Sequence, residues 1–402
     1  MPVDATSARL RGAAAPVLLA ALSALAAALS GHLVTAGRAG IDPPASAEEL
    51  GNALFFDVNL SKNRTQACAG CHSPNLAFTD PRNVPEVGGA VSRGDDGHSV
   101  GERNTPTATY AALTPEFRVE ANGRAVGGMF LDGRARNLEE QAGTPVLNPV
   151  EMGMPDKASV VARLKENPAY VTAFDALYGK GVLDSTETGY AAMGRAIAAF
   201  ERSPQFAPFD SKYDRYLRGE VELSKQEELG RVLFFSNQFT NCSQCHRLDT
   251  IGASEKETFT NYQYHNIGVP PNRTVLAANG KPNDRGLAAN PAIKGTPQET
   301  VQAGKFKVPT LRNVAVTSPY MHNGVFQDLR TVILFYDKYN NRSPKRQINP
   351  ETKQPWEAPE VPQNLSMKEL EIGPGLDDRR IDALVAFLKT LTDKRYESLV
   401  SP

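Results

Sequence analysis

Apolar residues recur at three- and four-residue intervals between residues 377 and 391. On a helix, this spacing places Ile381, Leu384, Val385 and Leu388 on one face, as expected of a helix that packs against a core. We expect a second helix from Asp328 to Tyr339 in the same half of the chain. Between these helices, residues 341–363 are polar and proline-rich, and this composition predicts a surface excursion.

The amino-terminal half shows a similar alternation in shorter segments. Helices are expected at 158–164, 168–177 and 190–201. The segment 73–126 is rich in Gly, Pro, Asn and Asp, which predicts long loops. Very little of the chain has the pattern of a strand. The expected fold class is therefore mainly α, with long loops and little strand.

One apolar pattern occurs twice. Residues 48–56 read EELGNALFF and residues 227–235 read EELGRVLFF. Each copy predicts a short amphipathic helix with a Leu-Phe-Phe end, and the repetition predicts two similar domains in tandem. Pro204 and Pro208 interrupt the chain after the 190–201 helix, so we expect residues 37–205 to form the first domain and 206–402 the second.

The first 36 residues have the order of a secretory signal. Arg9 and Arg11 precede an apolar run over 13–29, and small residues follow at 34–36. We expect a signal peptide over 1–36 and a periplasmic mature protein, with a retained membrane anchor as the alternative. No later segment is long and apolar enough to cross a bilayer, so no membrane contact is expected after signal removal.

Bulk composition narrows the class without identifying it. The chain has 402 residues, of which 41% are hydrophobic and 22% charged, as in ordinary globular proteins with room for two domains. Its net charge of −1 lacks the basic excess that nucleic-acid partners require. No nucleic-acid partner is expected.

All four cysteines belong to two copies of the motif Cys-x-x-Cys-His. The motif attaches c-type haem, with two thioether bonds to the porphyrin and the histidine on one face of the iron. Zinc binding or a redox dithiol is the alternative, but two complete motifs in one chain favour two covalently bound haems. The attachment residues are Cys68, Cys71, His72, Cys242, Cys245 and His246.

Several further blocks resemble the bacterial di-haem cytochrome c peroxidase superfamily, over residues 47–399. The blocks are FLDGR at 130–134, NPVEM at 148–152, PTLRN at 309–313 and PYMHNG at 319–324. Two more runs, 206–215 and 258–268, resemble the branch of that superfamily that serves methylamine utilisation. The resemblance implies two cytochrome c-like domains, the first with a peroxide-reactive haem and the second with an electron-transfer haem.

The sixth position of each iron decides its chemistry, because only an iron with an open face binds peroxide. Peroxidases of the superfamily carry a distal histidine soon after the first motif, whereas this chain has none between His72 and His98. His98 lies in a Gly/Asp-rich loop and is expected to be solvated, so we predict an open first haem. For the second haem, Met321 and Tyr336 are both candidates. The resemblance favours Tyr336 as ligand; a core aromatic is the alternative.

The resemblance also assigns residues around the haems. It places Gln141, Pro145 and Glu151 in the distal pocket of the first haem, where Glu151 is the candidate acid-base for peroxide cleavage. A capping or surface glutamate is the alternative. It further implies a calcium ion held by Asn104 and the carbonyls of Thr317 and Pro319, since oxygen donors suit this hard cation.

Two positions depart from the methylamine-utilisation branch. That branch carries tryptophan where this chain has Leu131 and Thr240, and the only tryptophan here is Trp356. In the branch these indoles share charge between the haems and relay it to the surface. Tyrosines could replace them, or the distance to the partner could be short enough without a relay.

The resemblance implies a periplasmic di-haem oxidase that uses peroxide-derived high-valent haem to oxidise tryptophan residues of a partner protein. The expected partner is the methylamine dehydrogenase precursor, whose tryptophan tryptophylquinone cofactor would be completed with hydrogen peroxide or dioxygen. One alternative is tryptophan oxidation in a different, copper-linked partner. Another is a peroxidase that takes electrons from a cupredoxin or small cytochrome, and a third is a plain electron carrier.

Overall fold

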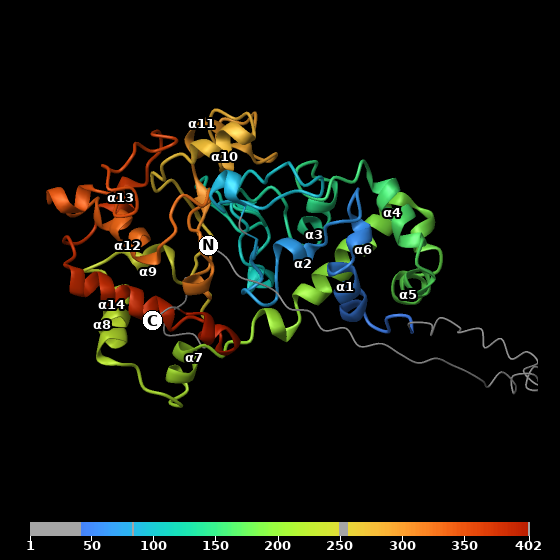
Figure 1. Cartoon of the computed structure of the whole chain (residues 1–402), viewed down its shortest axis with the longest axis horizontal. Coiled ribbons are helices and arrows are strands. Elements are labelled where there is room, and N and C mark those ends of the chain that lie inside the picture. Colours follow the sequence, from blue (N-terminus) through green and yellow to red (C-terminus); the bar gives the residue numbers. More distant parts are fainter. Residues whose placement is uncertain (1–41, 83, 249–255, 401–402) are drawn as a thin grey trace, which may run out of the picture. The chain divides into compact units, whose positions relative to one another are not determined.

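Two crossing pairs of helices carry the internal repeat (Figure 1). Helix α1 (Ala47–Phe55) packs across α6 (Thr186–Glu201), and α8 (Lys225–Phe235) packs across α14 (Asp378–Lys389). The rings of Phe55 and Phe200 lie 5.3 Å apart in the first pair, and those of Phe234 and Phe387 lie 5.3 Å apart in the second. The repeat read from the sequence therefore folds twice into the same helix crossing.

Glycine makes both crossings possible. A Cβ atom added at Gly51 would lie 1.9 Å from the carbonyl oxygen of Ala196, and one added at Gly230 would lie 1.9 Å from that of Ala383. These distances are far below any real contact, so the two backbones can approach this closely only because the EELG motif ends in glycine.

The structure is a computed structural model that describes residues 42–82, 84–248 and 256–400. Residues 43–402 cluster into one compact unit. The expected signal peptide over 1–36 lies outside the described residues. Nothing in the structure divides the two proposed domains, so the boundary at 205 and 206 stays a prediction.

Further helices surround the first crossing pair. They are α3 (Leu138–Leu147), α4 (Lys157–Lys165) and α5 (Pro168–Tyr178). Asn137, Asp156 and Asn167 are their N-caps, and each side chain accepts a hydrogen bond from a backbone N–H in the first turn. The expected helices at 158–164, 168–177 and 190–201 are confirmed, whereas α3 was not expected.

The second half has more short elements. They are α7 (Lys212–Leu217), α10 (Arg273–Ala278), α11 (Glu299–Gln302), α12 (Leu329–Asp337) and α13 (Met367–Leu370). Helix α12 packs on α14, and the side chains of Asp328 and Asp377 cap the two helices. Both expected helices of this half are confirmed.

Strands are few in the described part of the chain. Antiparallel pairing joins β1 (Arg118–Val119) to β2 (Ala125–Val126), and β3 (Tyr264–His265) to β4 (Phe306–Lys307). Single turns of 3₁₀-helix lie at Val58–Leu60, Pro85–Val87, Ala111–Leu113, Val182–Asp184, Pro204–Phe206, Leu287–Ala289, Val314–Val316, Pro344–Gln347 and Lys394–Leu399. The mainly helical fold class is confirmed, and no described helix has the length and hydropathy of a membrane span.

The proline-rich segment 341–363 is only partly a surface excursion. Arg346 and Val361 are buried, with 7% and 8% exposure. The indole of Trp356 donates a hydrogen bond from Nε1 to the carbonyl oxygen of Arg346 and packs edge-on against Phe335 of α12. The rest of the segment is exposed or half-buried apart from Asn349, so the expectation of a surface excursion holds except at these anchors.

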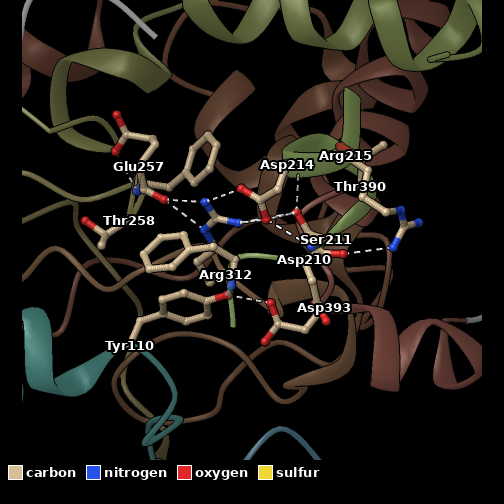
Figure 2. Close-up of polar contacts among 12 residues, drawn as sticks. Tyr110, Asp210, Ser211, Asp214, Arg215, Glu257, Thr258, Arg312, Thr390 and Asp393 are labelled. Carbon is tan, nitrogen blue, oxygen red and sulfur yellow. Dashed lines mark hydrogen bonds and ion pairs between the residues drawn. The ribbon is translucent and has the colours of Figure 1, made fainter. Parts of the chain in front are cut away.

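A buried ion pair joins segments that are distant in sequence (Figure 2). The guanidinium of Arg312 donates to both carboxylate oxygens of Asp214, at 2.5 and 2.9 Å, and to the carbonyl oxygen of Glu257. Arg312 is 1% exposed and Asp214 is 2% exposed. Because this fork is the geometry in which a buried pair offsets its desolvation, the contact stabilises the region where α7 meets the segment after the second Cys-x-x-Cys-His motif.

Candidate functional site

The first Cys-x-x-Cys-His motif forms a single helical turn, α2 (Cys68–Cys71), with His72 at its C-cap. The chain then folds back so that His72 Nδ1 donates a hydrogen bond to the carbonyl oxygen of Phe78, at 2.9 Å. Phe78 holds the left-handed backbone angle φ of +52° that this turn requires. With Nδ1 engaged, Nε2 is the nitrogen left to bind a metal.

The second motif repeats this geometry. Helix α9 (Cys242–Cys245) ends at His246, whose Nδ1 donates to the carbonyl oxygen of Phe259 at 3.2 Å. Phe259 also has a positive φ, of +55°. Both phenylalanines are followed by threonine, and this Phe-Thr pair is a repeat signal in the sequence that our reading missed.

Burial sets the protonation of these groups. It lowers the pKa of His246 to about 4 and lowers that of His72, so both imidazoles are neutral near pH 7 and able to bind iron. Burial also raises the pKa of Cys68 to about 12 and that of Cys245 to about 12. Both thiols are therefore protonated near pH 7.

Zinc binding, the alternative reading of the motif, needs more ligands than one motif supplies. Over residues 42–82, 84–248 and 256–400, no group of three or more His, Cys, Asp or Glu side chains could hold a metal ion. Each motif therefore offers one histidine and two thiols in the arrangement that suits haem attachment.

Glu151 lies on the turn that follows α3, close to the first motif. Burial raises the pKa of Cys68 and of Cys71, and the negative charge of Glu151 adds to both shifts. Burial raises the pKa of Glu151, and the positive charge of Arg134 opposes that shift. The amide of Asn148 donates to Glu151 Oε1 at 2.8 Å. A half-buried carboxyl held in this way can both release and accept a proton.

Gln141 and Pro145 lie one helical turn apart on α3, and both are half-buried. The carbonyl oxygen of Pro145 accepts hydrogen bonds from the backbone N–H groups of Asn148 and Met152, at 3.2 Å each. Helix α3 therefore sets the position of the turn that carries Glu151.

A cavity of about 360 Å³ adjoins the second motif, and this volume is typical of a cofactor pocket. Its wall includes the thiols and histidine of the motif together with both candidates for the sixth iron ligand. These lining residues are Cys242, Cys245, His246, Met321 and Tyr336. The structure therefore brings together the residues predicted for the second haem.

Both candidates for the sixth ligand lie on the wall of this cavity. Burial raises the pKa of the Tyr336 hydroxyl, and the charges of Cys245 and Cys242 raise it further. Met321 lines the same cavity with a backbone φ of +71°. The choice between them rests on the resemblance, which favours Tyr336.

Two further histidines line the cavity with buried nitrogens. His265 Nε2 and His322 Nε2 have no hydrogen-bond partner among the described residues, although His322 Nε2 lies 3.4 Å from Glu360 Oε2. Unpaired buried donors of this kind fit the carboxylates of a haem, so the chemistry of the wall agrees with the chemistry of the motif. The sequence reading did not select these residues.

The three residues predicted to hold calcium come together. Asn104, Thr317 and Pro319 line a small pocket of about 10 Å³, the room that one water or one ion occupies. The amide nitrogen of Asn104 donates to the carbonyl oxygen of Ala90 at 3.0 Å, which turns the oxygen end of the amide away from Ala90. A calcium site formed by these residues stays a prediction.

The positions that depart from the tryptophan pattern also lie at the cavity. Leu131 and Thr240 both line it. Leu131 follows Phe130, whose ring lies 3.6 Å from the guanidinium of Arg134. By contrast, His98 is exposed in a turn closed by Asp96, as expected of a solvated loop histidine.

Residues 45–222 match the family described as di-haem cytochrome c peroxidase. The chain is 56% identical to methylamine utilization protein MauG of Paracoccus denitrificans over 87% of this chain and 89% of that protein. The fold is similar to the diheme peroxidase BthA from Burkholderia thailandensis, with a TM-score of 0.79, 33% identity and 89% coverage of both chains. It is also similar to a MauG-like protein associated with microbial copper homeostasis, with a TM-score of 0.61, 29% identity and coverage of 90% and 95%.

Proposed function

The chain belongs to the di-haem cytochrome c peroxidase family, whose members are oxidoreductases with two haems, and on this premise we propose a MauG-type function for it. The protein oxidises tryptophan residues of the methylamine dehydrogenase precursor and so completes the tryptophan tryptophylquinone cofactor. Hydrogen peroxide or dioxygen is the oxidant.

In this proposal, Cys68, Cys71 and His72 hold the first haem, and the second motif holds the other through Cys242, Cys245 and His246. Bound haem supplies the one-electron and peroxide chemistry that no side chain provides. The carbonyl groups of Phe78 and Phe259 fix the two imidazole rings, so each histidine presents Nε2 to its iron.

Glu151 moves the proton at the first site. Cleavage of the peroxide O–O bond requires one proton to pass from one oxygen to the other, and the half-buried carboxyl of Glu151 would carry it. Gln141 and Pro145 would shape the pocket in which this occurs. The raised pKa of Glu151 supports the role, because it makes the carboxylate a stronger proton acceptor.

The observation that carries the assignment is the position of Tyr336 on the wall of the cavity that also contains Cys242 and Cys245. A tyrosine ligand stabilises oxidised iron, whereas the methionine of an electron-entry haem raises the potential. This choice favours an oxidase that stores oxidising equivalents over a peroxidase that takes electrons from a cupredoxin or small cytochrome.

A calcium ion held by Asn104 and the carbonyls of Thr317 and Pro319 is part of the proposal, as is a periplasmic location after removal of residues 1–36. Asn104 belongs to one half of the chain and Thr317 and Pro319 to the other. A bound ion would therefore tie the two halves together beside the second-haem cavity.

The test mixes the purified di-haem protein with hydrogen peroxide and the quinone-deficient methylamine dehydrogenase precursor, and follows quinone absorbance. Growth of the quinone band, absent without this protein and absent with His72→Ala, is the expected result. Rapid peroxide-driven oxidation of a reduced cupredoxin or cytochrome without a quinone band would assign the chain to the peroxidases.

A copper-linked partner protein is the second candidate. It is favoured by Leu131 and Thr240, which replace the indoles of the methylamine-utilisation branch, and by the similarity in fold to the protein associated with copper homeostasis. Peroxide-dependent oxidation of tryptophan in such a partner, with no quinone formed in the dehydrogenase precursor, would favour this candidate.

A further inference from the structure

A tyrosine and a carboxylate form a short, buried hydrogen bond in the interior of the unit (Figure 2). The hydroxyl of Tyr110 donates to Asp393 Oδ1 at 2.5 Å, across 283 positions of sequence. Tyr110 is 2% exposed and Asp393 is 0% exposed. The other oxygen of Asp393 accepts from the amide of Asn313 at 2.8 Å, so the carboxylate is fixed in place.

On one side, Tyr110 reaches the histidine of the first motif through two phenylalanines. Its backbone N–H donates to the carbonyl oxygen of Phe206 at 2.8 Å. The ring of Phe206 lies 4.1 Å from that of Phe78, and Phe78 supplies the carbonyl that holds His72. These contacts form a continuous path of packed groups from Tyr110 to the first haem ligand.

On the other side, Tyr110 lines the cavity of the second motif. The guanidinium of Arg312 lies 5.2 Å from the ring of Tyr110 and 5.3 Å from that of Phe259. Phe259 supplies the carbonyl that holds His246. Two packed groups therefore separate Tyr110 from the histidine of each motif.

A carboxylate partner together with a place on the cavity wall distinguishes Tyr110 from the other buried tyrosines. Tyr170 also has a hydrogen bond with a carboxylate, that of Asp57, but does not line the cavity. Loss of an electron makes a phenol strongly acidic, so a buried tyrosine is oxidised readily only if a base takes its proton. The hydroxyls of Tyr264 and Tyr396 donate to backbone carbonyls, of Gly127 and Pro74, and a carbonyl cannot keep a proton. Burial raises the pKa of Asp393, which strengthens it as a proton acceptor.

We propose that Tyr110 is a redox-active relay between the two haem sites and that Asp393 is its proton acceptor. The phenol gives one electron to a haem that peroxide has oxidised, and its hydroxyl proton passes to Asp393 Oδ1. A neutral tyrosyl radical and a protonated aspartate result. An electron from the other haem site then reduces the radical, and the proton returns to the tyrosine oxygen.

The inference rests on the proposed function in one respect, since peroxide must oxidise a haem of this chain. The relay would carry electrons between the two haem sites in a chain that has Leu131 and Thr240 at the positions where the methylamine-utilisation branch has tryptophan. The neighbouring Arg312 opposes a positive charge on the ring, so the electron leaves only as the proton moves.

The test uses the full holoprotein and hydrogen peroxide in a stopped-flow spectrometer, with the absorbance changes of both haems followed separately. Tyr110→Phe is expected to leave the response of the first haem intact and to slow the response of the second. Tyr264→Phe and Tyr396→Phe each remove a buried hydroxyl that has only a carbonyl partner, and both are expected to behave like the parent.

Deuterated solvent supplies an independent readout, because electron and proton move together. It is expected to slow the response of the second haem in the parent and not in Tyr110→Phe. Electron paramagnetic resonance of freeze-quenched samples, with ring-deuterated tyrosine, would detect the radical where it accumulates.

An unchanged response of the second haem in Tyr110→Phe would overturn the relay and leave the proposed function standing. If neither haem responds to peroxide in the parent, the proposed function fails and the relay fails with it. If Tyr110→Phe slows the second haem but no quinone forms, the relay role of Tyr110 stands and the methylamine dehydrogenase precursor is not the partner.

Discussion

The pKa of the buried carboxyl of Glu201 is set by its surroundings in the folded protein. It is the last residue of α6, is 6% exposed, and contributes to the raised pKa of Cys68. Burial raises its pKa to about 8. Because this pKa lies above the value of about 4.5 in the unfolded chain, the folded state binds the proton more tightly. The stability from this group is present in full below pH 4.5 and is lost as the pH rises through 8.

Glu201→Gln removes this titration. We expect the variant and the parent to unfold at similar temperatures at pH 5. At pH 9 the variant should exceed the parent by about 4 kcal/mol in free energy of unfolding. Thermal unfolding of both holoproteins by circular dichroism across this range is the measurement. A difference between them that does not change with pH would show that Glu201 does not titrate as described.

The proposed proton transfer at the first haem depends on the carboxyl group of Glu151. Glu151→Gln keeps the size of the side chain and the bond from Asn148 but removes the exchangeable proton, so the reaction with peroxide should slow by about 10² to 10⁴. Stopped-flow absorbance of the first haem measures this rate. Glu140→Gln, an exposed glutamate on α3, is the control and should react at the parental rate.

At the scale of elements, the two glycine crossings set how closely each helix pair approaches. Gly230→Ala introduces a methyl group 1.9 Å from the carbonyl oxygen of Ala383, so α8 and α14 must separate. We expect a loss of about 3 kcal/mol in stability, at the upper end of the overpacking range.

Chemical denaturation of the holoprotein measures this loss. Val232→Ala is the matched control, because Val232 is an exposed residue of the same helix and alanine favours a helix. Similar losses in the two variants would mean that the close approach of the helices does not determine stability.

Elements with strong periodicity could be predicted from the sequence, and elements defined by tertiary contacts could not. Helices α1, α8 and α14 were expected because their apolar faces repeat along the chain. Helix α3 was missed because it contains Gly143 and Pro145, which weaken any helical signal. The motif histidines were predicted, but the phenylalanine carbonyls that orient them were not, since a backbone acceptor leaves little trace in residue type.

The same limit applies to the candidate site. The calcium ligands Asn104, Thr317 and Pro319 were predicted only through the resemblance, because none of these residues belongs to a recognisable metal-binding motif. Tyr110 and Asp393 are 283 positions apart, and neither residue belongs to a motif. Contacts between distant segments arise from packing, which no local pattern encodes.

On the scale of the whole molecule, a bound calcium ion would couple the two halves of the chain. Binding to the folded state alone adds about 2.7 kcal/mol of stability when the free ion is at 100 times its dissociation constant. We expect a chelator to lower the unfolding temperature of the holoprotein and added Ca²⁺ to restore it.

Calorimetry in the presence of chelator, Ca²⁺ or Mg²⁺ tests this coupling. Mg²⁺ should restore little, because it keeps its water shell and prefers six-fold geometry. Asn104→Ala should make the unfolding temperature insensitive to Ca²⁺. An unfolding temperature that responds to Ca²⁺ equally in parent and variant would place the ion elsewhere.

Main-chain atoms hold both iron-binding histidines, since the acceptors are the carbonyl oxygens of Phe78 and Phe259. No substitution at these positions can delete a carbonyl, so this side of each iron is protected from variation and is nearly the same at both haems. Divergence between the two irons would then arise on the opposite faces, where we propose that Glu151 and Tyr336 lie. A new activity in this scaffold is therefore most accessible by altering the distal residues.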